Sequence, residues 1–214
     1  MLIDRAYAPV VTLGPGTRIA VWTVGCSKRC AGCANPELWR ADPRKEMDNV
    51  QLAEALIGMA QQSGIRRITF TGGDPFEQPE SLACVLAAIR PHFDDILVYT
   101  GYTLRELRAY ADRTLRLPEG RCDTAREGGN RSTRTAVRRA LDLIDALIDG
   151  PYIESLNDGA CPLRGSSNQN VHVFSESLRK DYDVALTQPR RIQNVHFGDT
   201  FMSIGIHGRP RTKA

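Results

Sequence analysis

Residues 19–33 read IAVWTVGCSKRCAGC, a β-branched and aromatic run that leads through one glycine into three closely spaced cysteines. The run from Ile19 to Val24 predicts a strand, bounded by Gly16 and Gly25. Cysteine thiolates suit iron–sulfur clusters, zinc and copper. Because ligands of parallel sheets gather beyond the carboxyl ends of the strands, the cysteines after this strand predict a metal-binding loop at that edge.

The rest of the chain alternates between helical and strand-like hydrophobic patterns. Strands separated by helices of this length imply βαβ units and a parallel sheet with right-handed crossovers. Thr103 and Glu106 form a capping box at the start of one helix. The expected fold class is therefore α/β with mostly parallel strands. Helices are expected over residues 50–62, 79–89, 103–111 and 135–143, and strands over 65–71, 95–100 and 143–148.

Two longer segments break this alternation. Residues 112–134 are rich in glycine, arginine and acids, have no apolar periodicity, and predict a long exposed loop. Residues 195–197 and 201–206 flank Gly198-Asp199 and predict a hairpin near the end of the chain.

The two ends of the chain carry weaker signals. Residues 1–16 are expected to be irregular or to form an edge strand, and residues 209–214 to form a frayed basic tail. A length of 214 residues favours a single domain over 1–214.

The composition, with 42% hydrophobic and 25% charged residues, is that of an ordinary globular domain. A formal charge of +3 argues against nucleic acid as the main partner. No apolar run approaches the roughly 20 residues that span a bilayer, and the N-terminus does not resemble a signal peptide. A cytoplasmic protein without membrane attachment is expected, in which six cysteines are poor disulfide candidates.

The three clustered cysteines, Cys26, Cys30 and Cys33, favour one kind of metal centre over another. A structural zinc site needs a fourth ligand, and Cys84, Cys122 and Cys161 are isolated in the sequence. Three thiolates instead suit a [4Fe–4S] cluster with one iron left open for a substrate or cofactor. From spacing alone, zinc remains the alternative.

A second candidate element, Thr71-Gly72-Gly73-Asp74-Pro75, follows the next expected strand and should lie at the same edge. The two glycines let backbone approach a bound group closely. Asp74 offers a carboxylate to an ammonium group. The alternative is a turn in which Asp74 caps the next helix.

Together these motifs resemble the radical S-adenosylmethionine superfamily, which has the C-x3-C-x2-C spacing and the Gly-Gly-Asp-Pro segment. Further pieces are similar to the activating proteins of anaerobic ribonucleoside-triphosphate reductase. These are Gly32-Cys33 with Asn35, Val98 to Tyr102, Ile148 to Tyr152, and Leu163 to Gln169. The resemblance covers residues 14–175. The loop 112–134 is longer than in that branch, and 176–214 extends past it.

The resemblance implies a partial (β/α) barrel with a C-terminal hairpin extension. It also implies that the three cysteines hold three irons, while the amino and carboxylate groups of S-adenosylmethionine chelate the fourth. Gly72, Gly73 and Asp74 would contact the methionine amine, Thr100 or Tyr102 would contact the cofactor, and Asn168 would reach its adenosyl part. For Thr100 and Tyr102 the alternative is that they belong to a buried strand end. For Asn168 it is a turn whose side chains hydrogen-bond their own backbone.

The implied activity is reductive cleavage of S-adenosylmethionine to a 5′-deoxyadenosyl radical. An external one-electron reductant such as flavodoxin or ferredoxin would supply the electron. The radical would take a hydrogen from a glycine Cα of a large partner, the anaerobic ribonucleotide reductase. Two alternatives share parts of the site: a radical enzyme that acts directly on a peptide or small molecule, and a non-catalytic electron-transfer module.

Overall fold

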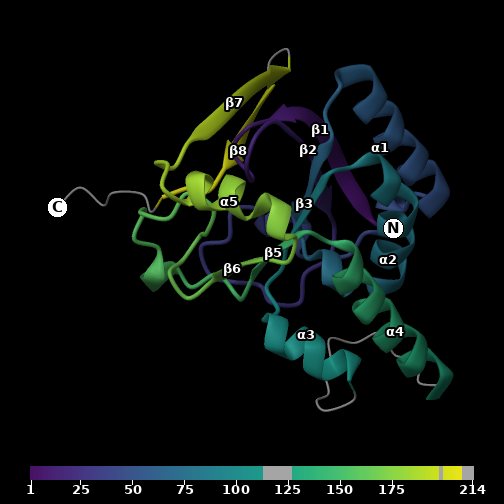
Figure 1. Ribbon diagram of the computed structural model, residues 1–214. Coiled ribbons are helices and arrows are strands. Elements are labelled where there is room, and N and C mark those ends of the chain that lie inside the picture. The colour runs from purple at the N-terminus through teal and green to yellow at the C-terminus, as the bar shows by residue number, and fades with distance from the viewer. Residues whose placement is uncertain (113–126, 198–199, 209–214) are drawn as a thin grey trace.

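The computed structural model describes residues 1–112, 127–197 and 200–208. Six strands form one sheet in the order β1-β2-β3-β4-β5-β6, so spatial order follows chain order (Figure 1). Strands β2 to β5 are parallel, and the edge strands β1 and β6 are antiparallel to their neighbours. The strands are β1 Ile3–Val10, β2 Arg18–Thr23, β3 Arg67–Gly72, β4 Asp95–Tyr99, β5 Ala146–Asp149 and β6 Asn170–Val173.

The mostly parallel α/β class is therefore confirmed. Within the described residues no hydrogen-bonded pairing joins β1 to β6, so the sheet is open. Both of its faces are covered, as is usual for parallel strands. Side chains alternate along β2: Ile19 and Val21 belong to the core cluster on one face, and Ala20 and Trp22 belong to the cluster on the other.

The first face packs against the crossover helices, which are coloured blue to green in Figure 1. Asp48 caps α1 by accepting hydrogen bonds from the amides of Val50 and Gln51. Thr103 and Glu106 form the expected capping box of α3. The helices are α1 Asn49–Ser63, α2 Pro79–Ile89, α3 Leu104–Ala111 and α4 Glu127–Leu143.

The second face is covered by the C-terminal residues. Helix α5, Arg179–Leu186, and a hairpin of β7, Ile192–Phe197, and β8, Thr200–Gly205, lie on the side of the sheet away from α1 and α2 (Figure 1). The Ile204 side chain enters the cluster around Trp22. The extension is therefore part of the hydrophobic core.

A buried polar network anchors α5 to the amino ends of the strands. The guanidinium of Arg18 lies 2.6 Å from Asp95, and both side chains are fully buried. The hydroxyl of Tyr182, also buried, donates to the other Asp95 oxygen at 3.0 Å. Removing one partner of such a pair leaves an uncompensated buried charge, which costs about 3–5 kcal/mol.

The expected elements differ from the observed ones in three places. The prediction of a loop over 112–134 is wrong at its carboxyl end, because α4 already begins at Glu127. Residues 113–126 of that loop lie outside the described residues. Helix α5 and strand β6 were not expected. The expected hairpin is present but longer, and its turn at 198–199 lies outside the described residues.

The other expected helices and strands are confirmed within three residues at each end, including the edge strand in 1–16. The helix expected over 135–143 is the exception, since α4 begins at Glu127. The tail expected over 209–214 lies outside the described residues. In the part of the chain that the structure describes, no helix is both long enough and apolar enough to span a membrane.

Candidate metal centre

Cys26, the first residue of the cysteine loop, lies three residues beyond Thr23, the carboxyl end of β2, at the edge of the sheet where the sequence predicts it. Two main-chain hydrogen bonds close its base: the Gly25 amide donates to the Leu38 carbonyl at 2.8 Å, and the Cys26 amide donates to the Trp39 carbonyl at 3.0 Å. Cys26, Cys30 and Cys33 are all partly exposed. The loop therefore presents three accessible thiols on a base fixed by backbone pairing.

The pair Gly72-Gly73 brings β3 against the base of the cysteine loop. The Gly73 amide donates to the Thr23 carbonyl, and the Asp74 amide to the Gly25 carbonyl, both at 2.8 Å. A Cβ on Gly73 would lie 2.5 Å from the Gly25 carbonyl oxygen, and Gly72 has a φ of +98°. The close approach that these glycines permit is thus to the strand that carries the cysteines.

Asp74 is buried, with 1% of its surface exposed. Its Oδ1 accepts hydrogen bonds from the Phe76 amide at 3.0 Å and the Thr100 hydroxyl at 2.9 Å, and its Oδ2 accepts one from the Gly101 amide at 2.8 Å. Asp74 caps the 3₁₀ turn Pro75–Glu77 and not the expected helix α2, whose N-cap is Gln78. Asp74 also joins the ends of β3 and β4, and burial raises its pKa to about 7.

Glu77, in the 3₁₀ turn after β3, joins the cysteine loop to the segment that follows β4. One Glu77 oxygen accepts from the Ser27 amide at 3.0 Å, the Ser27 hydroxyl at 2.5 Å and the Tyr102 hydroxyl at 2.9 Å. The Lys28 ammonium lies 3.9 Å from the centre of the Tyr102 ring, a cation–π contact. Sequence reasoning missed Glu77, although it stands three residues after Asp74.

Asn168 lies on the far side of the loop, in the turn before β6. Its Nδ2 donates to the Pro151 carbonyl at 2.8 Å, whereas its Oδ1 is buried and has no hydrogen-bond partner. Buried polar groups are nearly always paired, so the Oδ1 is an acceptor available to a ligand. Gln169 binds the Gly165 amide and the Gly150 carbonyl, each at 2.8 Å, which satisfies its own turn.

The segment after β5 touches the cysteine loop directly. The main chain of Tyr152 lies beside the Cys30 thiol and lowers its pKa, against the larger effect of burial, which raises it. Gly32 has a φ of +70°, which favours glycine and explains why one precedes the third cysteine, and a Cβ there would lie 2.9 Å from the Glu154 carboxylate. Sequence reasoning identified the Ile148 to Tyr152 motif but not this contact.

The electrostatics of the loop favour the protonated thiol in the absence of metal. Burial raises the pKa of the Cys26 thiol to about 11, and the charges of Asp74 and Glu77 raise it further, against hydrogen bonds from the Lys28 and Arg29 amides. Burial also raises the pKa of Cys30. Metal ligation requires thiolates, so loading this site releases protons.

The arrangement fits a large cofactor better than a single ion. Across the described residues, no three His, Cys, Asp or Glu side chains lie close enough together to share one metal ion. Sulfurs around tetrahedral zinc, each about 2.3 Å from the metal, lie roughly 4 Å apart. A four-iron cube takes one thiolate at each of three corners and tolerates wider spacing. The Asn35 amide, which donates to the Cys33 sulfur at 3.4 Å, suits such a cluster.

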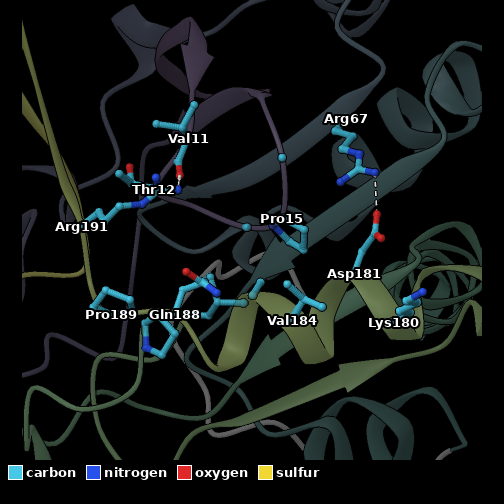
Figure 2. A pocket seen from close by; sticks show the side chains of 15 residues that line it. Val11, Thr12, Pro15, Arg67, Lys180, Asp181, Val184, Gln188, Pro189 and Arg191 are labelled. Atoms are coloured by element: carbon cyan, nitrogen blue, oxygen red, sulfur yellow. Dashed lines mark hydrogen bonds and ion pairs between the residues drawn. The ribbon is translucent and has the colours of Figure 1, made fainter.

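A cavity of about 350 Å³ lies at the opposite end of the strands, between residues 11–16, the start of β3 and α5 (Figure 2). Among its charged groups, Arg67 pairs with Asp181 at 2.6 Å and Arg191 donates to the Val11 carbonyl at 3.2 Å, and Lys180 also lines it. The cavity does not face the cysteines, and it contains none of the candidate site residues.

Comparison with known proteins places these features in a family. The model of the 4Fe-4S single cluster domain matches residues 12–172. The anaerobic ribonucleoside-triphosphate reductase-activating protein of Salmonella typhimurium is 34% identical over 176 residues, which cover 78% of this chain and 95% of the relative. The protein of the same name from Escherichia coli K12 is 30% identical, with the same coverage of both chains. The one from Enterobacteria phage T4 is 25% identical over 184 residues, 84% of this chain and 99% of the relative.

Proposed function

The chain belongs to the 4Fe-4S single cluster domain family and to the anaerobic ribonucleoside-triphosphate reductase-activating proteins, and on that basis we propose how its residues serve as a radical-generating activase. When bound, the cluster would supply the electron for cleavage of S-adenosylmethionine into methionine and a 5′-deoxyadenosyl radical, which would take one hydrogen from a glycine Cα of the anaerobic ribonucleotide reductase. The protein's part is to hold cluster and cofactor and to exclude side reactions.

Cys26, Cys30 and Cys33 are the proposed cluster ligands. The observation that carries this assignment is that all three thiols lie on one loop, which is clamped at its base and in which the Asn35 amide donates to the Cys33 sulfur at 3.4 Å. The remaining iron is open to the amino and carboxylate groups of S-adenosylmethionine.

Gly72, Gly73, Asp74 and Thr100 form the proposed methionine side of the cofactor site. Their main chains and the Asp74 carboxylate lie at the rim beside Cys26. Asn168 is proposed to accept a hydrogen bond from the adenosyl part, supported by its unpartnered, buried Oδ1. The cofactor then lies between the β3–β4 rim and the turn before β6.

The wider setting follows from the same proposal. The chain is a single domain of the radical S-adenosylmethionine type, whose open sheet is a partial barrel. Its electron comes from an external reductant such as flavodoxin or ferredoxin, and nucleic acid takes no part. A cytoplasmic location is proposed because thiolate ligands persist in a reducing compartment.

Anaerobic reconstitution with iron and sulfide tests the ligand assignment. The wild-type chain should hold about four irons, and Cys26→Ala, Cys30→Ala and Cys33→Ala should each lose them. Cys84→Ala is the matched control, because Cys84 is exposed on α2, and it should load fully. One zinc and no iron in a fully loaded wild-type protein would contradict the assignment.

Electron paramagnetic resonance tests the activity. With reductant, S-adenosylmethionine and the reductase subunit, a glycyl radical split by one α-hydrogen should appear on the subunit. Turnover of a free peptide or metabolite at enzyme-like rates, without that subunit, would instead support the direct-acting radical enzyme.

A further inference from the structure

The cavity at the amino ends of the strands depends on the C-terminal extension (Figure 2). Residues of the β1–β2 loop and Arg67 of β3 line it from the sheet, and residues of α5 and of the segment that follows α5 line it from the extension. Helix α5 lies outside residues 12–172 that the family model matches. A volume of about 350 Å³ is within the range of small-molecule sites.

Basic side chains outnumber acidic ones around this cavity. It is lined by Arg67, Lys180 and Arg191, against a single carboxylate, that of Asp181. Figure 2 shows Arg191 on one side of the cavity and Arg67 with Asp181 on the other. The excess of positive charge in a hollow of the surface attracts an anion.

Both arginines retain hydrogen-bond donors for such an anion. Arg67 uses its Nη2 for the pair with Asp181 at 2.6 Å, and Arg191 uses its Nη2 for the Val11 carbonyl at 3.2 Å. Within the described parts of the chain, no residue accepts a hydrogen bond from the Nε or Nη1 of either arginine. Since a guanidinium carries N–H groups on all three nitrogens, each arginine keeps most of its donors for a ligand.

The main chain of the β1–β2 loop adds further donors to the lining. Thr12 and Gly14 line the cavity, and both residues are buried. Among the residues that the structure describes, none accepts a hydrogen bond from the amide of Thr12 or of Gly14. Buried backbone N–H groups without a partner are rare, so this part of the lining favours a ligand that supplies acceptors.

Proline and aliphatic side chains form much of the remaining lining. They are Pro15, Pro162, Leu163, Val184 and Pro189. A bare inorganic anion gains little from such a surface, whereas the organic part of a larger ligand is removed from water there. The lining therefore indicates a ligand that has both an anionic group and an apolar part.

We propose that this cavity binds an organic phosphate, with the phosphate group held by Arg67 and Arg191 and the organic part against the prolines. A phosphate monoester carries about two negative charges and presents acceptor oxygens in several directions. Donors on opposite sides of a cavity suit such a group better than they suit a planar carboxylate. The inference does not rest on the proposed function, because the cavity contains none of the residues proposed to hold cluster or cofactor.

Isothermal titration calorimetry of the reconstituted protein with phenyl phosphate tests the proposal. Phenyl phosphate should bind saturably at about one molecule per chain and more tightly than inorganic phosphate, which lacks the apolar part. Phenol, which lacks the phosphate, should show no measurable binding. Phenyl phosphate should also raise the melting temperature as its concentration increases, since it binds the folded state.

Two substitutions in the lining should weaken this binding. Arg191→Gln removes a charge-assisted contact to the phosphate and should lower the affinity by roughly 10- to 100-fold. Val184→Glu adds a negative charge to the lining and should also lower the affinity. Val184 is 54% exposed, so the fold should tolerate the glutamate.

Arg179→Gln is the matched control. It removes the same charge from α5, where Arg179 is exposed, pairs with Glu176 and does not line the cavity. Its affinity for phenyl phosphate should equal that of the wild type. Equal losses in Arg179→Gln and Arg191→Gln would overturn the proposal, because attraction by net charge would then explain the binding.

Two further results would overturn the proposal. One is the absence of saturable binding of phenyl phosphate up to about 10 mM, well above the dissociation constant expected of a specific site. The other is wild-type affinity in both Arg191→Gln and Val184→Glu, which would place the bound phosphate elsewhere on the protein.

Discussion

Replacing Asp74 by asparagine is expected to change how the stability of the metal-free protein depends on pH. Burial raises the Asp74 pKa from 3.8 to about 7. The folded state therefore keeps a proton that the unfolded state has released. The contribution of this group to stability is complete below about pH 4 and is lost as the pH rises through about 7.

The magnitude follows from the size of the shift. At about 1.4 kcal/mol per pKa unit, Asp74 costs the folded protein about 4 kcal/mol above its folded-state pKa. Between about pH 5 and about pH 8, the free energy of unfolding of the wild type should fall by roughly 2–3 kcal/mol relative to Asp74→Asn. In Asp74→Asn the side-chain NH₂ must face the amide of Phe76 or of Gly101, both of which are hydrogen-bond donors. This loss of an acceptor lowers the free energy of unfolding by roughly 1–3 kcal/mol at every pH.

Urea unfolding of the metal-free protein under anaerobic reducing conditions measures this difference. Asp94→Asn is the control, because Asp94 is exposed and its ion pair with Arg66 lowers its pKa, so its effect on stability has the opposite pH dependence. A difference between wild type and Asp74→Asn that is constant with pH would refute the reasoning. The hydrogen bonds to the carboxylate would then outweigh burial and keep Asp74 ionised.

Three further substitutions test how the site is held. Glu77→Ala removes the acceptor of three hydrogen bonds that clamp the cysteine loop, and should speed iron loss to a chelator by about 10-fold or more. Gly73→Ala should lower both melting temperature and iron content, whereas Gly58→Ala, with open space at its Cβ in α1, should stabilise by up to about 1 kcal/mol. Arg18→Leu should cost about 3–5 kcal/mol by urea unfolding, against about 1 kcal/mol or less for Arg66→Ala at its exposed ion pair.

The sequence predicts those parts of the site whose signal is local. The spacing of the three cysteines and the strand before them place the loop at the right edge of the sheet. The contacts of Asp74 are not local, because Thr100 lies 26 residues away and meets it only when β3 and β4 pair. Glu77 has the same difficulty, since its role depends on Ser27 and Tyr102 coming to one point.

The elements that sequence reasoning missed owe their structure to tertiary contacts. Helix α5 is short and mostly polar, and the Tyr182 hydroxyl on buried Asp95 holds it in place. Strand β6 has only four residues and lies at the edge of the sheet. Gly128-Gly129 suggests a loop, yet both residues belong to α4, whose Val137 and Ala140 pack in the core behind them.

The C-terminal extension links the two ends of the sheet. At the amino ends of the strands, Tyr182 completes the buried Arg18–Asp95 pair. At the cysteine side, Arg190 binds Asn157, which donates to the hydroxyl of Tyr152 in the segment after β5. Since Arg190 follows Tyr182 by only eight positions, a change that frees α5 should also loosen the restraint on Tyr152. A helix far from the cysteines therefore contributes both to the stability of the sheet and to the position of the segment beside the cysteine loop.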